Sequence, residues 1–221
     1  MRTTALLFVF LAMPLFAGEP NVKNAQLEHV RASGDLVSQI AASRGWVGHM
    51  LPLAEPRSIS CNCDSGCDGD ETDELGLLYH VENGEIDAIR VAAPDCRFNA
   101  HGEHVAWIDD AGERAAIDAL IDIAKHGRKN VRTKALFWLG MQAGAKAAQA
   151  LRNAVDDDPE SEVKTRAVFG ISQLPDDQSI PLLVELMKTH RSREVRRKAA
   201  FWLSQKSDPR AVSAIEEMLM K

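Results

Sequence analysis

Three segments of the sequence align at a spacing of 32 residues, and this repeat restricts the fold more than any other feature. The segments are VRTKALFWLG from Val131, VKTRAVFGIS from Val163 and VRRKAAFWLS from Val195. Their valine, alanine and phenylalanine positions coincide, and glycine, aspartate and proline gather between them, as they do where helices end. A fixed period of this length predicts an α-solenoid, in which each repeat packs against its neighbours.

Each repeated segment has the periodicity of a helix that buries one side. At 100° per residue, the valine, the alanine and the following leucine or isoleucine centre near about 40° and define the core side. The phenylalanine falls at about 240°, nearly opposite, and a basic residue falls at about 300°. The surface opposite the core is therefore expected to carry Phe137, Phe169 and Phe201 together with Lys134, Arg166 and Lys198.

This surface is a candidate partner-binding site. Aromatic rings interleaved with cations favour an acidic or aromatic extended peptide, and solenoids commonly bind such segments on their concave side. The alternative is that the phenylalanines are packing positions, buried by neighbouring side chains or covered by the N-terminal half of the chain. The sequence alone leaves both interpretations open.

The repeat also carries a family resemblance. The pattern D-x-x-x-x-V-[RK]-x-x-A-x-x-x-L, present as Asp158, Val163, Lys164, Ala167 and Ile171, resembles the second helix of HEAT repeats. It is most similar to the short bacterial variety shared with the bilin-lyase-like (PBS lyase) repeats. The resemblance implies that each repeat consists of an outer helix followed by an inner helix.

In this chain the resemblance implies helix pairs at 113–140, 145–173 and 177–205, and a lone last helix at Arg210–Met220. His126 and His190 stand where the family has an acidic residue in the first and third repeats. We therefore expect the Asp–Arg ladder of the family to be interrupted there. The segment RVAAPDCRFNAHGEHVAWI is similar to part of exported HEAT-repeat proteins of uncharacterised function.

Charge divides the chain into two halves. The 221 residues have a net charge of −6, but residues 1–110 carry a net −10 and residues 111–221 a net +4. Such an asymmetry predicts two units with different surfaces, with a boundary near residue 110. The overall acidity argues against a nucleic-acid partner, because those proteins usually show a basic excess.

The first residues read as a secretory signal peptide. Arg2 precedes an apolar run of 12 residues, Ala5–Phe16, and Ala17 is a small residue suited to cleavage. The run is shorter than the roughly 20 residues that span a bilayer, so we expect no membrane insertion once residues 1–17 are removed. The mature protein is predicted to be periplasmic or secreted.

Export favours disulfides among the four cysteines, Cys61, Cys63, Cys67 and Cys96. A Cys61–Cys63 bridge closes a strained ring, so we expect one bridge within Cys61–Cys67 and one from that loop to Cys96. Zinc bound by these cysteines with His101 or His104 is the competing interpretation, although C-x-C spacing suits zinc poorly.

The N-terminal half is expected to be small and β-rich. Residues 18–44 are predicted to be helical or irregular, with loosely helical spacing of apolar residues over Asn21–Ser43. Residues 45–110 are predicted to form an acidic antiparallel sheet, with hairpins at Asn83-Gly84 and at His101-Gly102. The predicted fold is thus α+β, with a disulfide-stapled β-rich domain before a HEAT-like α-solenoid at 111–221.

The functional prediction is an exported, non-catalytic interaction module that recognises a protein or an extended peptide through the repeats. We expect no cofactor, because no nucleophile–base pair, phosphate loop or metal triad is evident in the sequence. The alternatives are an enzyme or cofactor-handling protein related to the PBS-lyase-like proteins, and an exported metal-binding protein that uses the Cys61–Cys67 loop.

Overall fold

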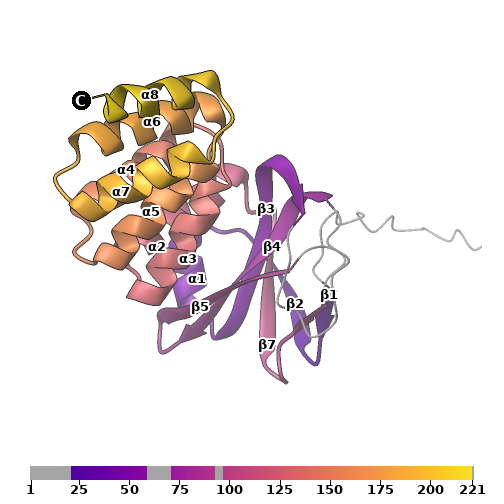
Figure 1. The fold of residues 1–221 in the computed structure, drawn as a ribbon. Helices are drawn as coiled ribbons and strands as arrows, with labels where there is room; N and C mark the ends of the chain where they lie inside the picture. The colour runs from indigo at the N-terminus through magenta and orange to yellow at the C-terminus, as the bar shows by residue number, and fades with distance from the viewer. Residues whose placement is uncertain (1–20, 59–70, 93–96, 221) are drawn as a thin grey trace, which may run out of the picture.

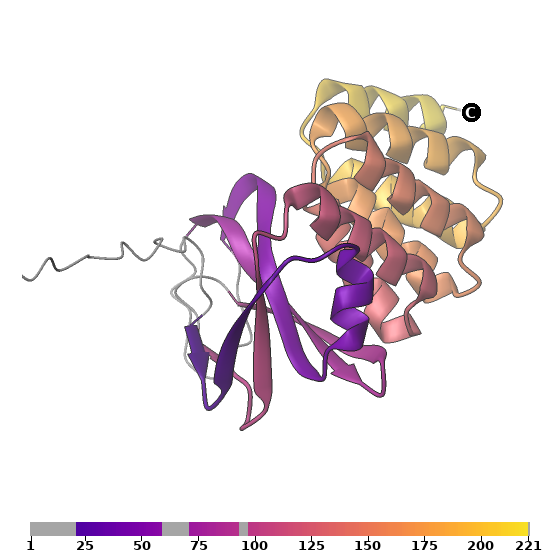
Figure 2. The same ribbon diagram turned by 180° about the vertical axis from the view of Figure 1, so that it is seen from behind.

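The computed structural model describes residues 21–58, 71–92 and 97–220. A sheet layer stands beside a stack of helices (Figure 1), and the view from behind shows α1 between the two (Figure 2). The signal peptide predicted at 1–17 and all four cysteines lie outside the described residues, so export and disulfides stay predictions. In the described ranges, no helix is long and apolar enough to cross a membrane.

Among the described residues, the larger sheet has five strands in the order β2-β7-β3-β4-β5. Their bounds are Gln26–Arg31 (β2), Gly45–Ser58 (β3), Glu71–Glu82 (β4), Glu85–Ala92 (β5) and His104–Asp109 (β7). β7 pairs in parallel with both β2 and β3, whereas the β3–β4 and β4–β5 pairs are antiparallel.

The sheet is therefore mixed, and the prediction of a purely antiparallel sheet is wrong. The reason lies in α1 (Leu36–Ala42), which returns the chain from the end of β2 to the start of β3. Both strands then run in the same direction, and β7 inserts between them as their common neighbour.

The first predicted hairpin is present, and the second is not. Asn83 and Gly84 have φ angles of 56° and 78°, which suit the tight turn that joins β4 to β5. His101 and Gly102 also have positive φ angles, but the strands beside them do not pair with each other. β6 (Arg97–Asn99) pairs instead with β1 (Asn21–Lys23) in a separate two-stranded parallel sheet.

The segment 21–43 contains two strands, β1 and β2, before its short helix α1, which corrects the interpretation of Asn21–Ser43 as one helical stretch. Leu27 and Val30 suggested a helix because they lie three residues apart, but in β2 this spacing sends them to opposite faces of the sheet. Leu27 packs against the cluster around Trp107, and Val30 packs against the main core. Helix begins only at α1, where Asp35 accepts a hydrogen bond of 3.0 Å from the Ser38 N–H.

The two faces of the sheet pack against different clusters. One face carries Trp107, and Gly48 makes room for its ring, because a Cβ there would lie 2.7 Å from the indole. The other face joins α1 and the first helix of the stack. That main core is one continuous cluster running from Leu36 to Ala214, so the sheet and the helices share their interior.

Seven helices follow the sheet in the described chain. They are α2 (Glu113–His126), α3 (Lys129–Gly140), α4 (Ala145–Asp157), α5 (Ser161–Gln173), α6 (Asp176–Thr189), α7 (Arg193–Ser204) and α8 (Pro209–Leu219). The pairs α2–α3, α4–α5 and α6–α7 have bounds within a residue or two of those the resemblance implies, and α8 is the lone last helix.

The inner helices α3, α5 and α7 follow one another through the stack (Figure 1). Their repeated core residues are fully buried: Val131, Val163, Val195, Ala135, Ala167 and Ala199. Between α3 and α5 the backbones meet at Gly140 and Gly170, where a Cβ on Gly140 would lie 2.5 Å from the Gly170 carbonyl oxygen. Glycine is therefore required at this crossing.

One rung of the charged ladder joins successive repeats. Arg132 Nε and Nη2 donate to the two carboxylate oxygens of Asp158 at 3.0 and 3.2 Å, a bidentate pair. His190 occupies the equivalent position in the next repeat, as the sequence shows, and Lys164 instead donates to the carbonyl oxygens of Val155 and Asp156. The interruption expected from His190 is therefore present.

Candidate functional site

The three predicted phenylalanines form one ladder of rings across the inner helices. Phe137 and Phe169 stack with ring centroids 5.8 Å apart, and the ring centroid of Phe169 lies 4.8 Å from that of Trp202 on the next inner helix, α7. Phe201 contacts Trp202 edge-on at 4.9 Å. These separations lie in the range of favourable aromatic pairs, so the rings support one another between repeats.

Exposure increases along the ladder. Phe137 and Phe169 are half-buried, whereas Phe201 is 52% exposed and counts among the large apolar side chains most open to solvent in the described chain. The two interpretations of the phenylalanines therefore apply to different repeats: the first two rings pack, and the third is open. We call Phe137, Phe169, Phe201, Lys134, Arg166 and Lys198 together the inner-helix surface.

The three predicted cations differ in the same way. Lys134 Nζ donates to the Ile89 carbonyl oxygen at 3.1 Å, and burial, with a smaller effect of Arg90, lowers the pKa of Lys134. Arg166 is exposed, with its guanidinium carbon 5.7 Å from the centroid of Phe169, a cation–π distance. Lys198 is exposed as well.

The sheet covers the first inner helix. Strand β5 lies along α3, where Asn130 Nδ2 donates to the Asp87 carbonyl oxygen at 3.1 Å and Arg128 pairs with Glu85. This contact explains the burial of Lys134, since its Nζ reaches β5 instead of solvent. The open part of the inner-helix surface is thus centred on the second and third repeats.

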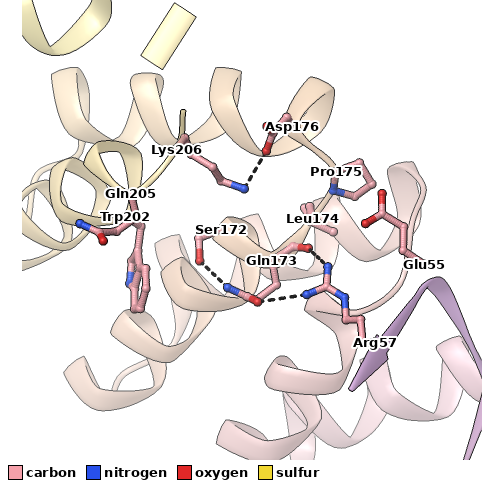
Figure 3. Close-up of a pocket in the computed structure, with 10 residues that line it drawn as sticks. All are labelled: Glu55, Arg57, Ser172, Gln173, Leu174, Pro175, Asp176, Trp202, Gln205 and Lys206. Atoms are coloured by element: carbon pink, nitrogen blue, oxygen red, sulfur yellow. Dashed lines mark hydrogen bonds and ion pairs between the residues drawn. The ribbon is translucent and has the colours of Figure 1, made fainter. Parts of the chain in front are cut away.

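A pocket of about 490 Å³ continues this open part beside Trp202 (Figure 3). Its walls come from β3 (Glu55 and Arg57), from the end of α5 and start of α6 (172–176), and from the end of α7 (Trp202, Gln205 and Lys206). The pocket therefore joins the sheet to the last two inner helices.

Most charged groups of the pocket already have partners. Arg57 donates through Nη2 to the Gln173 carbonyl oxygen at 3.1 Å and through Nη1 to the Gln173 side-chain oxygen at 3.3 Å. Lys206 Nζ lies 2.8 Å from an Asp176 carboxylate oxygen. Within the described residues, no hydrogen bond or ion pair is found for the Glu55 carboxylate.

The family of HEAT repeats matches residues 95–172 and 151–221, which together make up more than half of the chain. The chain belongs to the HEAT-repeat family. The HEAT assignment predicted from the repeated pattern is therefore confirmed. In HEAT terms, the ladder of rings lies on the second helix of each repeat, and the pocket lies where those helices end.

A solved complex resembles part of this HEAT protein. It is the complex of CpcE and CpcF of phycocyanin lyase from Nostoc sp. PCC7120, with 21% sequence identity and a TM-score of 0.34. The similarity covers 48% of this chain and 65% of the matching chain in that complex. No protein of curated function matches the sequence.

The pocket residues were missed by the sequence analysis, although a signal for them exists. The HEAT repeats align through Ser172 and Ser204, and one residue further on both repeats carry glutamine, Gln173 and Gln205. That recurrence marks the ends of two inner helices. Glu55 and Arg57 have no such signal, because they reach the pocket from a strand far away in the sequence.

The most strongly perturbed titratable groups lie away from any surface of the HEAT protein. His49 and Tyr79 are fully buried, and His49 Nε2 lies 3.1 Å from the Tyr79 hydroxyl. Burial lowers the pKa of His49 to about 4 and raises the pKa of Tyr79. A pair closed off from solvent serves packing, since a substrate cannot reach it. Across the described residues, no group of three histidine, cysteine or acidic side chains is arranged so that it could hold a metal ion.

Proposed function

We propose that the chain is a non-catalytic interaction module that binds a protein or an extended peptide through the open part of its inner-helix surface. The observation that carries this proposal is the exposure of Phe201, at 52%, at the end of a ladder of packed aromatic rings. A large aromatic ring held in place on a rigid helix is a typical anchor of protein interfaces. Arg166 and Lys198 supply positive charge beside it.

The charge pattern supports an acidic partner segment. Exposed cations on α5 and α7 attract carboxylates, while the rings offer apolar contact area. Binding of this kind weakens with added salt, because exposed charges are screened over about 8 Å at physiological ionic strength. The acidic sheet of the same chain already uses this attraction on the first repeat, where Glu85 meets Arg128.

Site-specific photo-cross-linking tests the proposal. A photoreactive phenylalanine analogue placed at Phe201 is expected to form an adduct with a protein from the exported fraction of the source cells. The same analogue at Ser213, an exposed position on α8, serves as the control and is expected to form none. Lys198→Glu should abolish the Phe201 adduct by reversing the charge beside it.

Two results count against this function. Equal adducts from Phe201 and Ser213 mean that the contact is unspecific. An adduct from Phe201 that survives both Lys198→Glu and high salt means that the cations of the inner-helix surface do not take part.

The proposal includes export to the periplasm or the medium and two disulfides among Cys61, Cys63, Cys67 and Cys96. Both rest on sequence patterns at residues outside the described ranges. An enzymatic or cofactor-handling role and a metal site at the Cys61–Cys67 loop are the alternatives. Intact mass with and without reductant separates disulfides from a bound metal, because each disulfide adds two hydrogens on reduction.

A further inference from the structure

The three inner helices end in the same way. The positions that follow one another at 32-residue spacing are Met141, Gln173 and Gln205. In each case the next amide N–H donates to the carbonyl three residues before it, at 3.1 Å for Gln142, 3.2 Å for Leu174 and 3.1 Å for Lys206. The carbonyls at positions 141, 173 and 205 lie at the last turn of their helices, where carbonyl groups have no partner inside the helix. Each can accept a hydrogen bond from outside the helix.

Strand β3 supplies that bond at the first two ends. The Ala54 N–H donates to the Met141 carbonyl oxygen at 3.1 Å. At the second end the Arg57 guanidinium donates to both the backbone and the side-chain oxygen of Gln173. An extended piece of this chain thus already crosses the ends of two inner helices, with one donor residue at each.

The third end has the same acceptors and no described donor. Ser204 Oγ donates to the Phe201 carbonyl at 2.7 Å, as Ser172 Oγ does to the Phe169 carbonyl. Gln205 Nε2 donates to Ser204 at 3.2 Å, matching 3.1 Å for Gln173 and Ser172. The amide of Gln205 is therefore oriented like that of Gln173, while no hydrogen bond to its two oxygens is found within the described chain.

The pocket around Gln205 adds two features that suit a cation. In Figure 3, Trp202 and Gln205 lie on one side of the space and Glu55 and Arg57 on the other. The indole of Trp202 lines the space beside Gln205 and suits a planar cation. Glu55, on the other side, adds a carboxylate that has no partner among the described residues. Arg57 and Lys206 are held by Gln173 and Asp176 and do not fill the space.

We propose that this pocket binds the guanidinium group of an arginine side chain from the partner polypeptide. The guanidinium donates to the backbone and side-chain oxygens of Gln205, as Arg57 does to those of Gln173, and stacks on the indole of Trp202. Arginine fits better than lysine, because its planar fork reaches two acceptors at once and stacks on an aromatic ring. The inference deepens the proposed function, on which it rests, by naming a side chain that the partner contributes.

A small probe tests the pocket without the partner. N-acetyl-argininamide is titrated into the full chain while the tryptophan indole and glutamine side-chain N–H signals are followed by nuclear magnetic resonance. We expect saturable shifts at Trp202 and Gln205. N-acetyl-citrullinamide, which has nearly the same shape but no charge, should bind about tenfold more weakly, because it lacks the charge-assisted bonds.

Single variants locate the binding. Gln205→Ala should weaken the argininamide about fivefold or more, because it removes a direct acceptor. Glu55→Gln, on the other side of the pocket, should weaken it less. The matched controls are Gln149→Ala on the outer helix α4 and Glu216→Gln on α8, both exposed and expected to bind like the unchanged protein. Circular dichroism of each variant checks that the fold is retained.

Three results overturn the inference: argininamide and citrullinamide that bind equally, shifts that do not saturate, and unchanged binding in Gln205→Ala. If the Phe201 cross-link persists in such a case, the interaction module stands and only the arginine pocket is rejected. If argininamide binds as expected while the cross-link is absent, the pocket stands and the partner surface is rejected.

Discussion

The ring of Phe169 lies 4.8 Å from the indole of Trp202, although the two residues belong to successive repeats. Trp202 stands at the repeat position that Gly170 holds in the middle repeat, one residue after Phe169, so the middle repeat has no aromatic ring of its own there. The middle repeat therefore receives an aromatic ring from its neighbour. This contact makes Phe169 part of the packing between repeats, whereas Phe201, at the end of the ladder of rings, is exposed to solvent.

Replacing Phe169 and Phe201 with alanine, one at a time, should show how much each ring contributes to stability. Phe169→Ala removes the contacts with Phe137 and Trp202, and we expect a loss of about 2 kcal/mol, less than the roughly 3–5 kcal/mol of a fully buried phenylalanine. Phe201→Ala should cost less than about 1 kcal/mol. Urea unfolding followed by circular dichroism measures both. An equal loss in the two variants contradicts the graded exposure.

Gly170→Ala should destabilise the stack of helices. A Cβ at this position would lie 2.8 Å from the Leu136 carbonyl oxygen and 2.6 Å from a methyl group of Leu151, and the backbone of α3 cannot yield without separating the helices. We expect a loss of about 2–3 kcal/mol in unfolding free energy. Gly112→Ala is the control, since no atom lies near its Cβ, and should cost less than about 1 kcal/mol. Similar melting temperatures for the two variants count against the close crossing.

Stability should fall as the pH drops from 7 to 4, in part through His49. The carbonyl of Met50, 2.8 Å from Nδ1, requires a proton on that nitrogen, so in the neutral ring Nε2 accepts from the Tyr79 hydroxyl. Burial opposes the protonation of Nε2, because the charged ring would lose its contact with water. Burial lowers the pKa of His49 from 6.5 to about 4. The unfolded chain therefore takes up a proton near pH 6.5 that the native state refuses.

The sign follows from that difference. Above pH 6.5 His49 is neutral in both the native and the unfolded state, so it does not lower the unfolding free energy. By pH 4 it lowers the unfolding free energy by about 3 kcal/mol. Denaturant unfolding at several pH values measures the slope. His49→Gln should flatten it, while His126→Gln, at an exposed site, should leave it unchanged. A slope that is identical in all three proteins shows that His49 is not its source.

The four cysteines should resist thiol labelling in the mature protein. Under denaturing, non-reducing conditions we expect no incorporation, because Cys61, Cys63, Cys67 and Cys96 are predicted to form two disulfides. After reduction all four should label, and the midpoint of unfolding should fall, since each bridge contributes about 2–4 kcal/mol. Labelling of two or more cysteines before reduction refutes the pairing. Intact mass before and after reduction is the independent check.

The repeats were predictable because their core is periodic. Valine and alanine at fixed offsets mark the buried side of each inner helix, and the same residues are buried in the structure. The N-terminal strands were not predictable in this way. Leu27 and Val30 serve two different cores, one on each face of β2, so their spacing mimics a helix.

The site was predictable in residue type but not in accessibility. The helical wheel placed Lys134, Arg166 and Lys198 on one surface, yet Lys134 is covered because β5 lies against α3. That contact joins segments 45 residues apart, and no local pattern encodes it. The pocket at Gln205 likewise depends on Glu55 and Arg57, whose position follows from the docking of the whole sheet.

The continuous core from Leu36 to Ala214 determines how the protein can be divided. The boundary near residue 110 separates the sheet and α1 from the helical repeats along the chain, but it does not separate two interiors. A cut there exposes the apolar side of α2 and the sheet face that covers it, so neither fragment keeps a closed core. Expression of residues 111–221 alone removes the wall that shields the first repeat, and we therefore expect the smallest folding unit to include the sheet.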